Sequence, residues 1–162
     1  MSSLQDINSP AIRELAERSI PHKIFQHPGP IHSLEQAAQE RSETPEQVVR
    51  SLLFRLSGDE FIMILAGGPQ QVSWKALRDY LGLSRMTMAA DEEVLTVTGA
   101  VPGTVSPFGL PAPLRILIDE AILSQPEVSL GSGIRGVAIL IHPQDLLKAI
   151  PGVEVIRLEK KN

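Results

Sequence analysis

Apolar residues recur along the chain with two periods, one typical of β-strands and one typical of α-helices. Two long apolar runs, 51–56 and 61–66, flank Ser57-Gly-Asp-Glu60 and predict a β-hairpin. The second run is apolar on both faces, which predicts a central strand. Shorter strands are expected at 22–26, 86–89, 114–119, around 128, at 137–141 and at 153–156.

Helices are predicted where a capping residue precedes apolar positions spaced three or four residues apart. The predicted starts are Ser9-Pro10, Ser33, Thr44-Pro45, Ser73 and His142-Pro143, with a further acidic helix at 90–95. Helices and strands alternate without a regular βαβ period. The pattern predicts one α+β domain over residues 1–162, with a mixed, barrel-like sheet and helices packed outside.

Composition narrows the class of protein further. The net charge of −4 argues against broad, non-specific nucleic-acid binding but leaves room for a local basic patch that grips one end of a nucleic acid. Cysteine is absent, which excludes disulfides, thiolate nucleophiles and Cys-ligated zinc. The sequence has no run of about 18 apolar residues and no signal-peptide pattern, so a cytoplasmic protein without a membrane span is expected.

Two glycine-rich segments, Gly99–Gly109 and Gly131–Gly136, are the candidates for a ligand-binding site. Glycine and proline at this density favour a fixed, irregular backbone over a helix or central strand. Two such loops in a small domain indicate a pocket where the main chain approaches a small molecule. Ordinary tight turns remain the alternative. Neither loop matches the P-loop or the dinucleotide-binding fingerprint.

The side chains that could act in catalysis do not by themselves identify a reaction. His22, His27 and His32 are five residues apart, a step that alternates faces along a strand, so surface or loop positions are favoured over a metal site. No serine stands in a Gly-x-Ser-x-Gly motif. The cations available for phosphate are Arg50, Arg55, Lys75, Arg78, Arg115 and Arg135. Of these, Arg50 precedes a core strand and Arg135 lies within a glycine loop.

Several segments occur in an order that resembles a known family. They are Pro30-Ile-His-Ser33, Glu35-Gln-Ala-Ala38, Val49-Arg-Ser-Leu-Leu-Phe54, the Gly99–Gly109 loop, Arg135-Gly136 and Pro143-Gln-Asp-Leu146. Together they resemble the YbaK/ProX (EbsC-like) family of aminoacyl-tRNA editing domains, over nearly the whole chain. The Val-Pro-Gly-x-Val-Ser-Pro-Phe-Gly stretch is the most specific of them.

The resemblance implies a free-standing, trans-editing aminoacyl-tRNA deacylase with the α/β barrel-like fold of that family. Its substrate would be a tRNA mischarged with Ala, Cys, Ser or Thr, with tRNA for proline favoured. The implied partners are the 3′ aminoacyl-adenosine end of that tRNA and prolyl-tRNA synthetase. No cofactor, no metal and no membrane are implied, and a monomer or weak homodimer is expected.

The resemblance also implies roles for individual residues. The backbone around Gly103 and Thr104 would hold the developing oxyanion, and Arg50 would anchor the 3′ end at the position of the family's lysine. The implied substrate-binding residues are His32, Ser51, Val105, Ser106, Phe108, Gly131, Ser132 and Arg135. The implied pocket floor comprises Ile31, Leu53, Ile64 and Ile118.

Two alternatives stay open. The Arg50-Ser51-Leu52 segment stands where the family has Lys-Thr-Leu, so the chain is alternatively a catalytically impaired module that binds aminoacyl-tRNA or aminoacyl-adenosine. A small-ester hydrolase using Ser106 or Ser132 is the other alternative.

Overall fold

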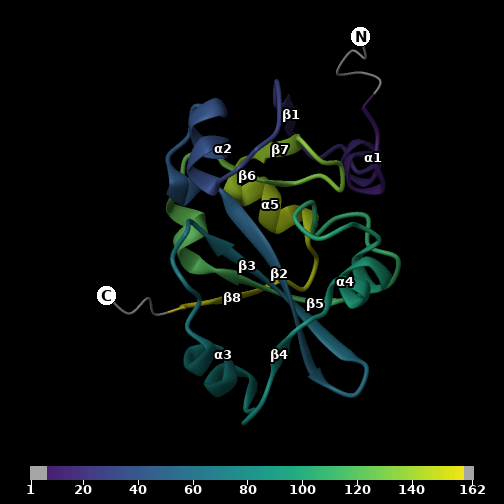
Figure 1. Cartoon of the computed structure of the whole chain (residues 1–162), viewed down its shortest axis with the longest axis vertical. Coiled ribbons are helices and arrows are strands. Elements are labelled where there is room, and N and C mark those ends of the chain that lie inside the picture. Colours follow the sequence, from purple (N-terminus) through teal and green to yellow (C-terminus); the bar gives the residue numbers. More distant parts are fainter. Residues whose placement is uncertain (1–6, 159–162) are drawn as a thin grey trace.

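Two β-sheets form the centre of the molecule in the computed structural model, which describes residues 7–158 (Figure 1). The five-stranded sheet has the order β4 (Thr87–Met88), β2 (Val49–Ser57), β3 (Glu60–Gly67), β5 (Arg115–Asp119) and β8 (Glu154–Ile156). Strands β4, β2 and β3 pair antiparallel, whereas β3, β5 and β8 pair in parallel. The three-stranded antiparallel sheet has the order β1 (Lys23–Gln26), β7 (Val137–Ile141) and β6 (Val128–Gly131).

The helices lie around these sheets (Figure 1). They are α1 (Pro10–Glu17), α2 (Leu34–Glu40), α3 (Trp74–Leu81), α4 (Asp91–Thr98) and α5 (Pro143–Ala149), with short 3₁₀ helices at Pro45–Gln47 and Glu120–Ser124. None of the helices in the described range is long and apolar enough to cross a membrane. The capping predictions are confirmed at α1 and α3. The Ser9 and Ser73 hydroxyl oxygens accept hydrogen bonds from backbone N–H groups at 3.2 and 3.1 Å.

The predicted hairpin between β2 and β3 is confirmed. The pairing runs from Val49–Gly67 to Ser57–Glu60, with a shift of register near Arg55. Gly58 turns the chain with a φ of +54°, a conformation that glycine adopts without strain. Because side chains alternate along β2, neighbouring residues enter two separate cores.

The two cores lie on opposite faces of the five-stranded sheet. Leu53, Met63 and Ile118 point into the larger core, which also contains buried residues of α1, α5 and the three-stranded sheet. Phe54 and Leu117 point to the other face, where α3 covers a smaller core. Burial of these side chains on both faces explains why the 61–66 run contains no polar residue.

The barrel-like sheet expected from the sequence is not closed. Among residues 7–158 the strands form two separate sheets, which one isolated bridge connects. It joins Val48, directly before β2, to Ser129 in β6. The mixed α+β class that the sequence predicts is nevertheless confirmed. Pairing between distant strands decides closure, and apolar periodicity carries no information about it. The 3₁₀ helix at Glu120–Ser124 was not predicted.

Candidate functional site

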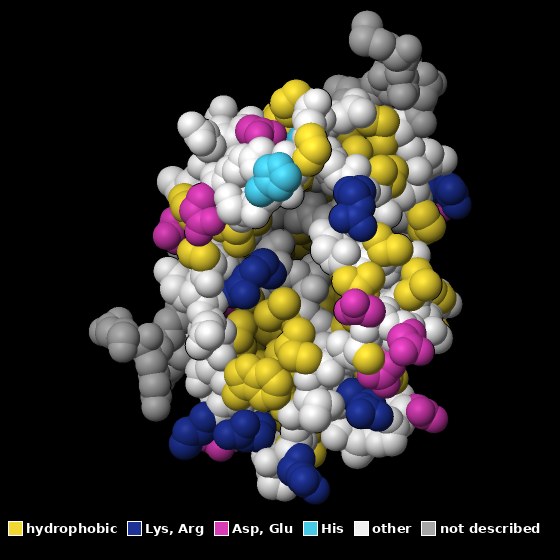
Figure 2. Space-filling view, viewed as in Figure 1, with side chains coloured by type: hydrophobic (Ala, Val, Ile, Leu, Met, Phe, Trp, Pro, Cys, Tyr) yellow, Lys and Arg dark blue, Asp and Glu magenta, His cyan; other side chains and the backbone are white. Residues whose placement is uncertain are grey.

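A cavity of about 890 Å³ opens where the two sheets meet. Figure 2 shows it as a hollow in the front face, with a histidine and Lys or Arg side chains at its edge. Four segments line it: residues 26–41, the start of β2, the glycine-rich loop after α4, and the turn from β6 to β7. Within the described residues, no aspartate or glutamate is part of the lining. The cavity is therefore suited to an anionic or neutral ligand.

The glycine-rich loop forms one wall through its backbone. The loop begins at Gly99, which ends α4 with a φ of +76°. The Thr104 N–H donates to the Val101 carbonyl at 3.1 Å, and the Thr104 carbonyl accepts from the Gly133 N–H at 2.8 Å. The second glycine loop therefore holds the first in place. Gly103 itself has a φ of +89° and lines the cavity.

The same loop leaves two backbone donors unused. Within residues 7–158, the N–H groups of Gly103 and Val105 have no hydrogen-bond partner, although both residues line the cavity. The Thr104 N–H and hydroxyl are both committed to Val101, so Thr104 is not one of the available donors. Adjacent main-chain N–H groups at a cavity wall can bind an anion or a polarised carbonyl oxygen.

Strand β2 supplies a cation and a hydroxyl. The Arg50 guanidinium donates to the Gly68 carbonyl at 2.8 Å and to the Gln70 carbonyl at 2.5 Å, which ties it to the loop before α3. Partial burial lowers the pKa of Arg50 below its ordinary value, yet the group remains charged. Ser51 lines the cavity, and its buried hydroxyl has no partner among the described residues. A buried hydroxyl without a partner is costly unless a ligand or water satisfies it.

A polar network that the sequence did not reveal includes two residues of the cavity lining, His27 and Arg41. His27 Nδ1 lies 2.6 Å from a Glu40 carboxylate oxygen, and the Arg41 Nε donates to His27 Nε2 at 3.0 Å. Because Nε2 accepts from Arg41, His27 is neutral and carries its proton on Nδ1, which donates to Glu40. Arg41 also donates to the Ser129 hydroxyl, which in turn donates to Glu43. Burial lowers the pKa of Arg41 and raises the pKa of Glu43.

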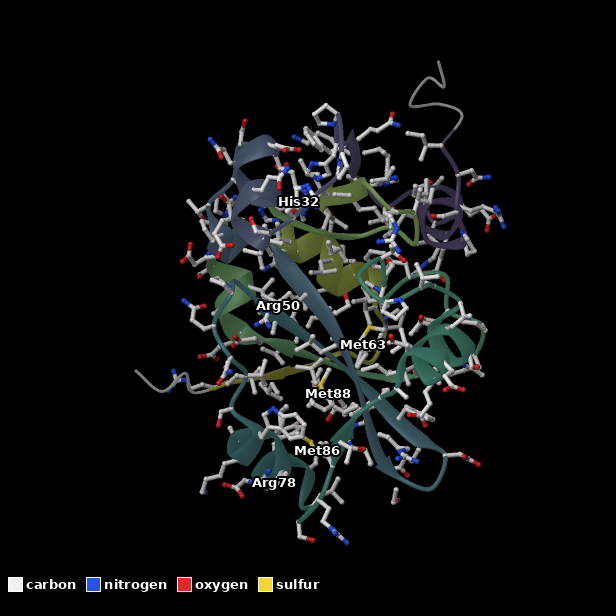
Figure 3. All side chains as sticks on the ribbon, viewed as in Figure 1. His32, Arg50, Met63, Arg78, Met86 and Met88 are labelled. Carbon is white, nitrogen blue, oxygen red and sulfur yellow. The ribbon has the colours of Figure 1, made fainter. Side chains whose placement is uncertain are left out.

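The structure brings most of the residues implied by the resemblance to this cavity. Those that line it are Arg50, Ser51, Gly103, Thr104, Val105, Gly131 and Arg135. His32 is not part of the lining, but its neighbours Ile31 and Ser33 are, and Figure 3 places it above Arg50 in the same view.

Three implied substrate-binding residues lie elsewhere. Ser106, Phe108 and Ser132 are buried and do not line the cavity. The Ser106 hydroxyl accepts from the Phe108 N–H at 3.2 Å, and the Ser132 hydroxyl donates to the Val137 carbonyl at 2.7 Å. These side chains hold the two glycine loops in shape, so substrate contacts are no longer assigned to them.

The implied pocket floor also needs correction. Ile31 lines the cavity, but Leu53, Ile64 and Ile118 do not. Ile64 points to the smaller core on the other face of the sheet, and Leu53 and Ile118 are buried in the larger core. The apolar lining comes instead from Leu34, Val48, Val49, Leu52, Leu130 and Ile134.

Comparisons with known proteins agree with this geometry. The sequence profile of the aminoacyl-tRNA editing domain matches residues 28–149. The chain is 32% identical to protein YwhH of Bacillus subtilis, over 70% of this chain and 72% of that protein. It is 21% identical to the prolyl-tRNA editing protein ProX of Acetoanaerobium sticklandii, over 90% and 91% of the two chains.

Two further similarities concern longer proteins and solved structures. A proline–tRNA ligase of Limosilactobacillus fermentum is 28% identical over 62% of this chain, and the match spans only 18% of that ligase. A crystal structure of a protein proposed to be a trans-editing enzyme for prolyl-tRNA synthetase superimposes with a TM-score of 0.84. That match has 28% identity and covers 96% of this chain and all of the other. The profile match over most of the chain and the shared fold show that this protein belongs to the family of aminoacyl-tRNA editing domains.

Proposed function

We propose that this chain is an aminoacyl-tRNA deacylase that hydrolyses the ester of a mischarged tRNA. The observation that carries the proposal is the pair of unused backbone donors, Gly103 and Val105, on the wall of the large cavity. They would bind the ester carbonyl oxygen and stabilise the oxyanion that develops on it. Thr104 would act by its hydrogen bonds, which fix the loop between these two donors.

Hydrolysis at such a site needs few side chains. A water oxygen would bond to the carbonyl carbon, the ester C–O bond would break, and the ribose oxygen would leave with a proton. Neither a free histidine nitrogen nor a carboxylate lines the cavity among residues 7–158, because His27 Nε2 accepts from Arg41. Catalysis would therefore rest on positioning and electrostatics, with the Ser51 hydroxyl able to hold the amine or a ribose hydroxyl.

Cations at the cavity would bind the terminal phosphates of the RNA. Arg50 of β2 and Arg135 of the β6–β7 turn both line the cavity. The two backbone carbonyls that Arg50 contacts would hold its guanidinium at the edge of the cavity. His32, between the lining residues Ile31 and Ser33 and above Arg50 in Figure 3, would contact the terminal nucleotide.

The relatives suggest the tRNA. Similarity to a prolyl-tRNA editing protein and to proline–tRNA ligases favours tRNA for proline carrying Ala, Cys, Ser or Thr. Matches that span nearly the whole of the shorter relatives favour action in trans. A protein of this family that edits charged tRNA would act in the cytoplasm. The cavity volume of about 890 Å³ would accommodate an aminoacyl-adenosine rather than an amino acid alone.

The test is deacylation of tRNA for proline charged with Ala, Cys, Ser, Thr or Pro. The proposal expects release of at least one non-cognate amino acid more than tenfold faster than spontaneous hydrolysis, with Pro-tRNA resistant. No release by the folded protein from any of the mischarged tRNAs would contradict it.

A second candidate is a binding module that has lost hydrolysis. It is favoured by one observation: Arg50 is held by two carbonyls at the position where the resemblance implies a lysine. In that case the parent would bind aminoacyl-tRNA without releasing the amino acid, and Arg50→Lys would restore release. The small-ester hydrolase loses its support because Ser106 and Ser132 lie outside the cavity lining.

A further inference from the structure

An exposed apolar surface lies beside the cavity and is not used by the proposed chemistry. It consists of Leu52, Trp74 and Met88, and we call it the Trp74 surface. Trp74 is 37% exposed and Met88 is 48% exposed, which is unusual for side chains of this size. In Figure 2 an apolar patch lies directly below the hollow, with Lys or Arg side chains above and below it.

The local structure explains why the indole remains exposed. Trp74 is the first residue of α3, directly after the capping residue Ser73, so its side chain lies at the N-terminal end of the helix. Its ring meets Phe54 at 5.2 Å between centroids and at 88° between planes. Met88 is the cross-strand neighbour of Phe54. A perpendicular contact covers at most one face of the indole, which leaves a flat face for another ring.

The Trp74 surface is continuous with the cavity. Arg50, Leu52 and Phe54 share one face of β2 because side chains alternate along a strand. Arg50 and Leu52 also line the cavity, and Phe54 supports Trp74. From Arg50 to Phe54 the strand rises about 13 Å, roughly the length of three or four stacked nucleotides.

Cations gather on the α3 side of this surface, although the whole chain carries a net charge of −4. Lys75, Arg78 and Arg85 lie on or just after α3, and Arg50 lies between the cavity and the apolar patch (Figure 3). Asp79 pairs with Lys75, while Arg78 and Arg85 make no ion pair within the described residues. An exposed aromatic ring flanked by cations is the arrangement that binds single-stranded nucleic acid.

We propose that the Trp74 surface binds the single-stranded 3′ end of the RNA, with one base stacked on the Trp74 indole and the backbone phosphates near Arg50 and Arg78. The identity of that strand as the end of a mischarged tRNA rests on the proposed function. The stacking of a base on the Trp74 indole is independent of the proposed function. A base held here would position the following nucleotides so that the ester enters the cavity.

The chain contains a single tryptophan, so its fluorescence reports on this surface directly. The probe is the RNA tetranucleotide ACCA, titrated into the intact parent protein at low salt. The expected result is saturable quenching that weakens as salt is added. An abasic ribose-phosphate oligomer of the same length is the matched ligand control and should not quench. Absence of quenching by ACCA, or equal quenching by the abasic oligomer, overturns the proposal.

Kinetics give a second readout with matched variants. Trp74→Leu is expected to raise KM for mischarged tRNA by about 5- to 150-fold, the range observed for loss of one stacked base. It should leave hydrolysis of the corresponding aminoacyl-adenosine unchanged, and Trp74→Phe should retain part of the affinity. Tyr80→Leu is the control because Tyr80 is an exposed aromatic residue on the same helix. Its hydroxyl donates a hydrogen bond to the Glu154 carboxylate.

The outcomes separate this proposal from the proposed function. If ACCA quenches the fluorescence but no variant releases an amino acid, the stacking proposal stands and the deacylase proposal fails. If Trp74→Leu slows tRNA and aminoacyl-adenosine hydrolysis equally, the stacking proposal fails and the deacylase proposal stands. Quenching by prolyl-tRNA synthetase and not by RNA would assign the surface to a protein partner and also overturn the stacking proposal.

Discussion

Gly131 at the end of β6 lies so close to the glycine-rich loop that a methyl group does not fit. A Cβ atom added there would lie 2.3 Å from the Val105 carbonyl oxygen and 2.7 Å from the Thr104 carbonyl oxygen. Both neighbours are backbone atoms, which cannot turn aside as a flexible side chain can. The loop would have to move by about 1 Å or more to restore ordinary contact distances.

The cost of Gly131→Ala follows from this displacement. Overpacking of a buried site costs about 1–3 kcal/mol. The hydrogen bond from the Gly133 N–H to the Thr104 carbonyl, 2.8 Å in the parent, would be strained or lost at about 0.5–1.5 kcal/mol. The free energy of unfolding should therefore fall by roughly 2–4 kcal/mol, which lowers Tm by about 4–16 °C. Deacylation should fall about 100-fold, because a shift of about 1 Å misplaces the oxyanion donors.

Thermal unfolding followed by circular dichroism measures the first effect, and single-turnover deacylation of a mischarged tRNA measures the second. Gly29→Ala is the matched control. Gly29 also lines the cavity, but a Cβ atom there meets nothing within 4 Å. The control should keep both Tm and rate. A Gly131→Ala protein with the Tm and rate of the parent would refute the claim that this contact fixes the loop.

Two further predictions concern polar side chains away from the loop. Hydrogen bonds from Arg115 lower the pKa of Glu154 from its ordinary 4.5 to about 2. This pair therefore stabilises the fold above pH 4.5 and loses that contribution as the pH falls through 2. Glu154→Gln should therefore lower the unfolding free energy at pH 7 by about 1 kcal/mol or less, as expected for a solvent-screened pair. In urea titrations the difference from the parent should shrink below pH 4.5 and vanish only below a pH of about 2. His27→Ala leaves the Arg41 Nε without its acceptor and opens a buried gap, so the free energy of unfolding should fall by about 2–4 kcal/mol. Urea unfolding at pH 7 measures it, and a loss under 0.5 kcal/mol would show that the network is not needed for the fold.

Local signals in the sequence predicted local structure well. The hairpin at Gly58 and the helix starts at Ser9 and Ser73 depend on neighbouring residues, and each is present. The split into two sheets depends on which distant strands pair, as at the bridge between Val48 and Ser129. Periodicity within a strand does not report its partner, so the sequence predicted the mixed α+β class correctly but could not show that the barrel-like sheet stays open as two sheets.

The candidate site was predicted in its position but not in all its parts. The two glycine-rich segments indicated a backbone-lined cavity, and part of each segment, 103–105 and Gly131 with 134–136, lines it. Ser132 was assigned to the substrate because it lies in such a segment, yet its hydroxyl bonds to the Val137 carbonyl inside the loop. The link from His27 to Arg41 joins a loop to the end of a helix, and neither residue alone carries a sequence signal for it. Tertiary contacts therefore decide which polar residues face a ligand and which stabilise loops.

The central claim is that the ester carbonyl binds to the backbone of the glycine-rich loop. The most direct measurement is a crystal structure with a stable amide analogue of aminoacyl-adenosine. We expect the amide carbonyl oxygen to accept hydrogen bonds from the N–H groups of Gly103 and Val105, at about 2.7–3.1 Å. An analogue seated in the cavity with its carbonyl turned away from this loop, or bound outside the cavity, would contradict the account.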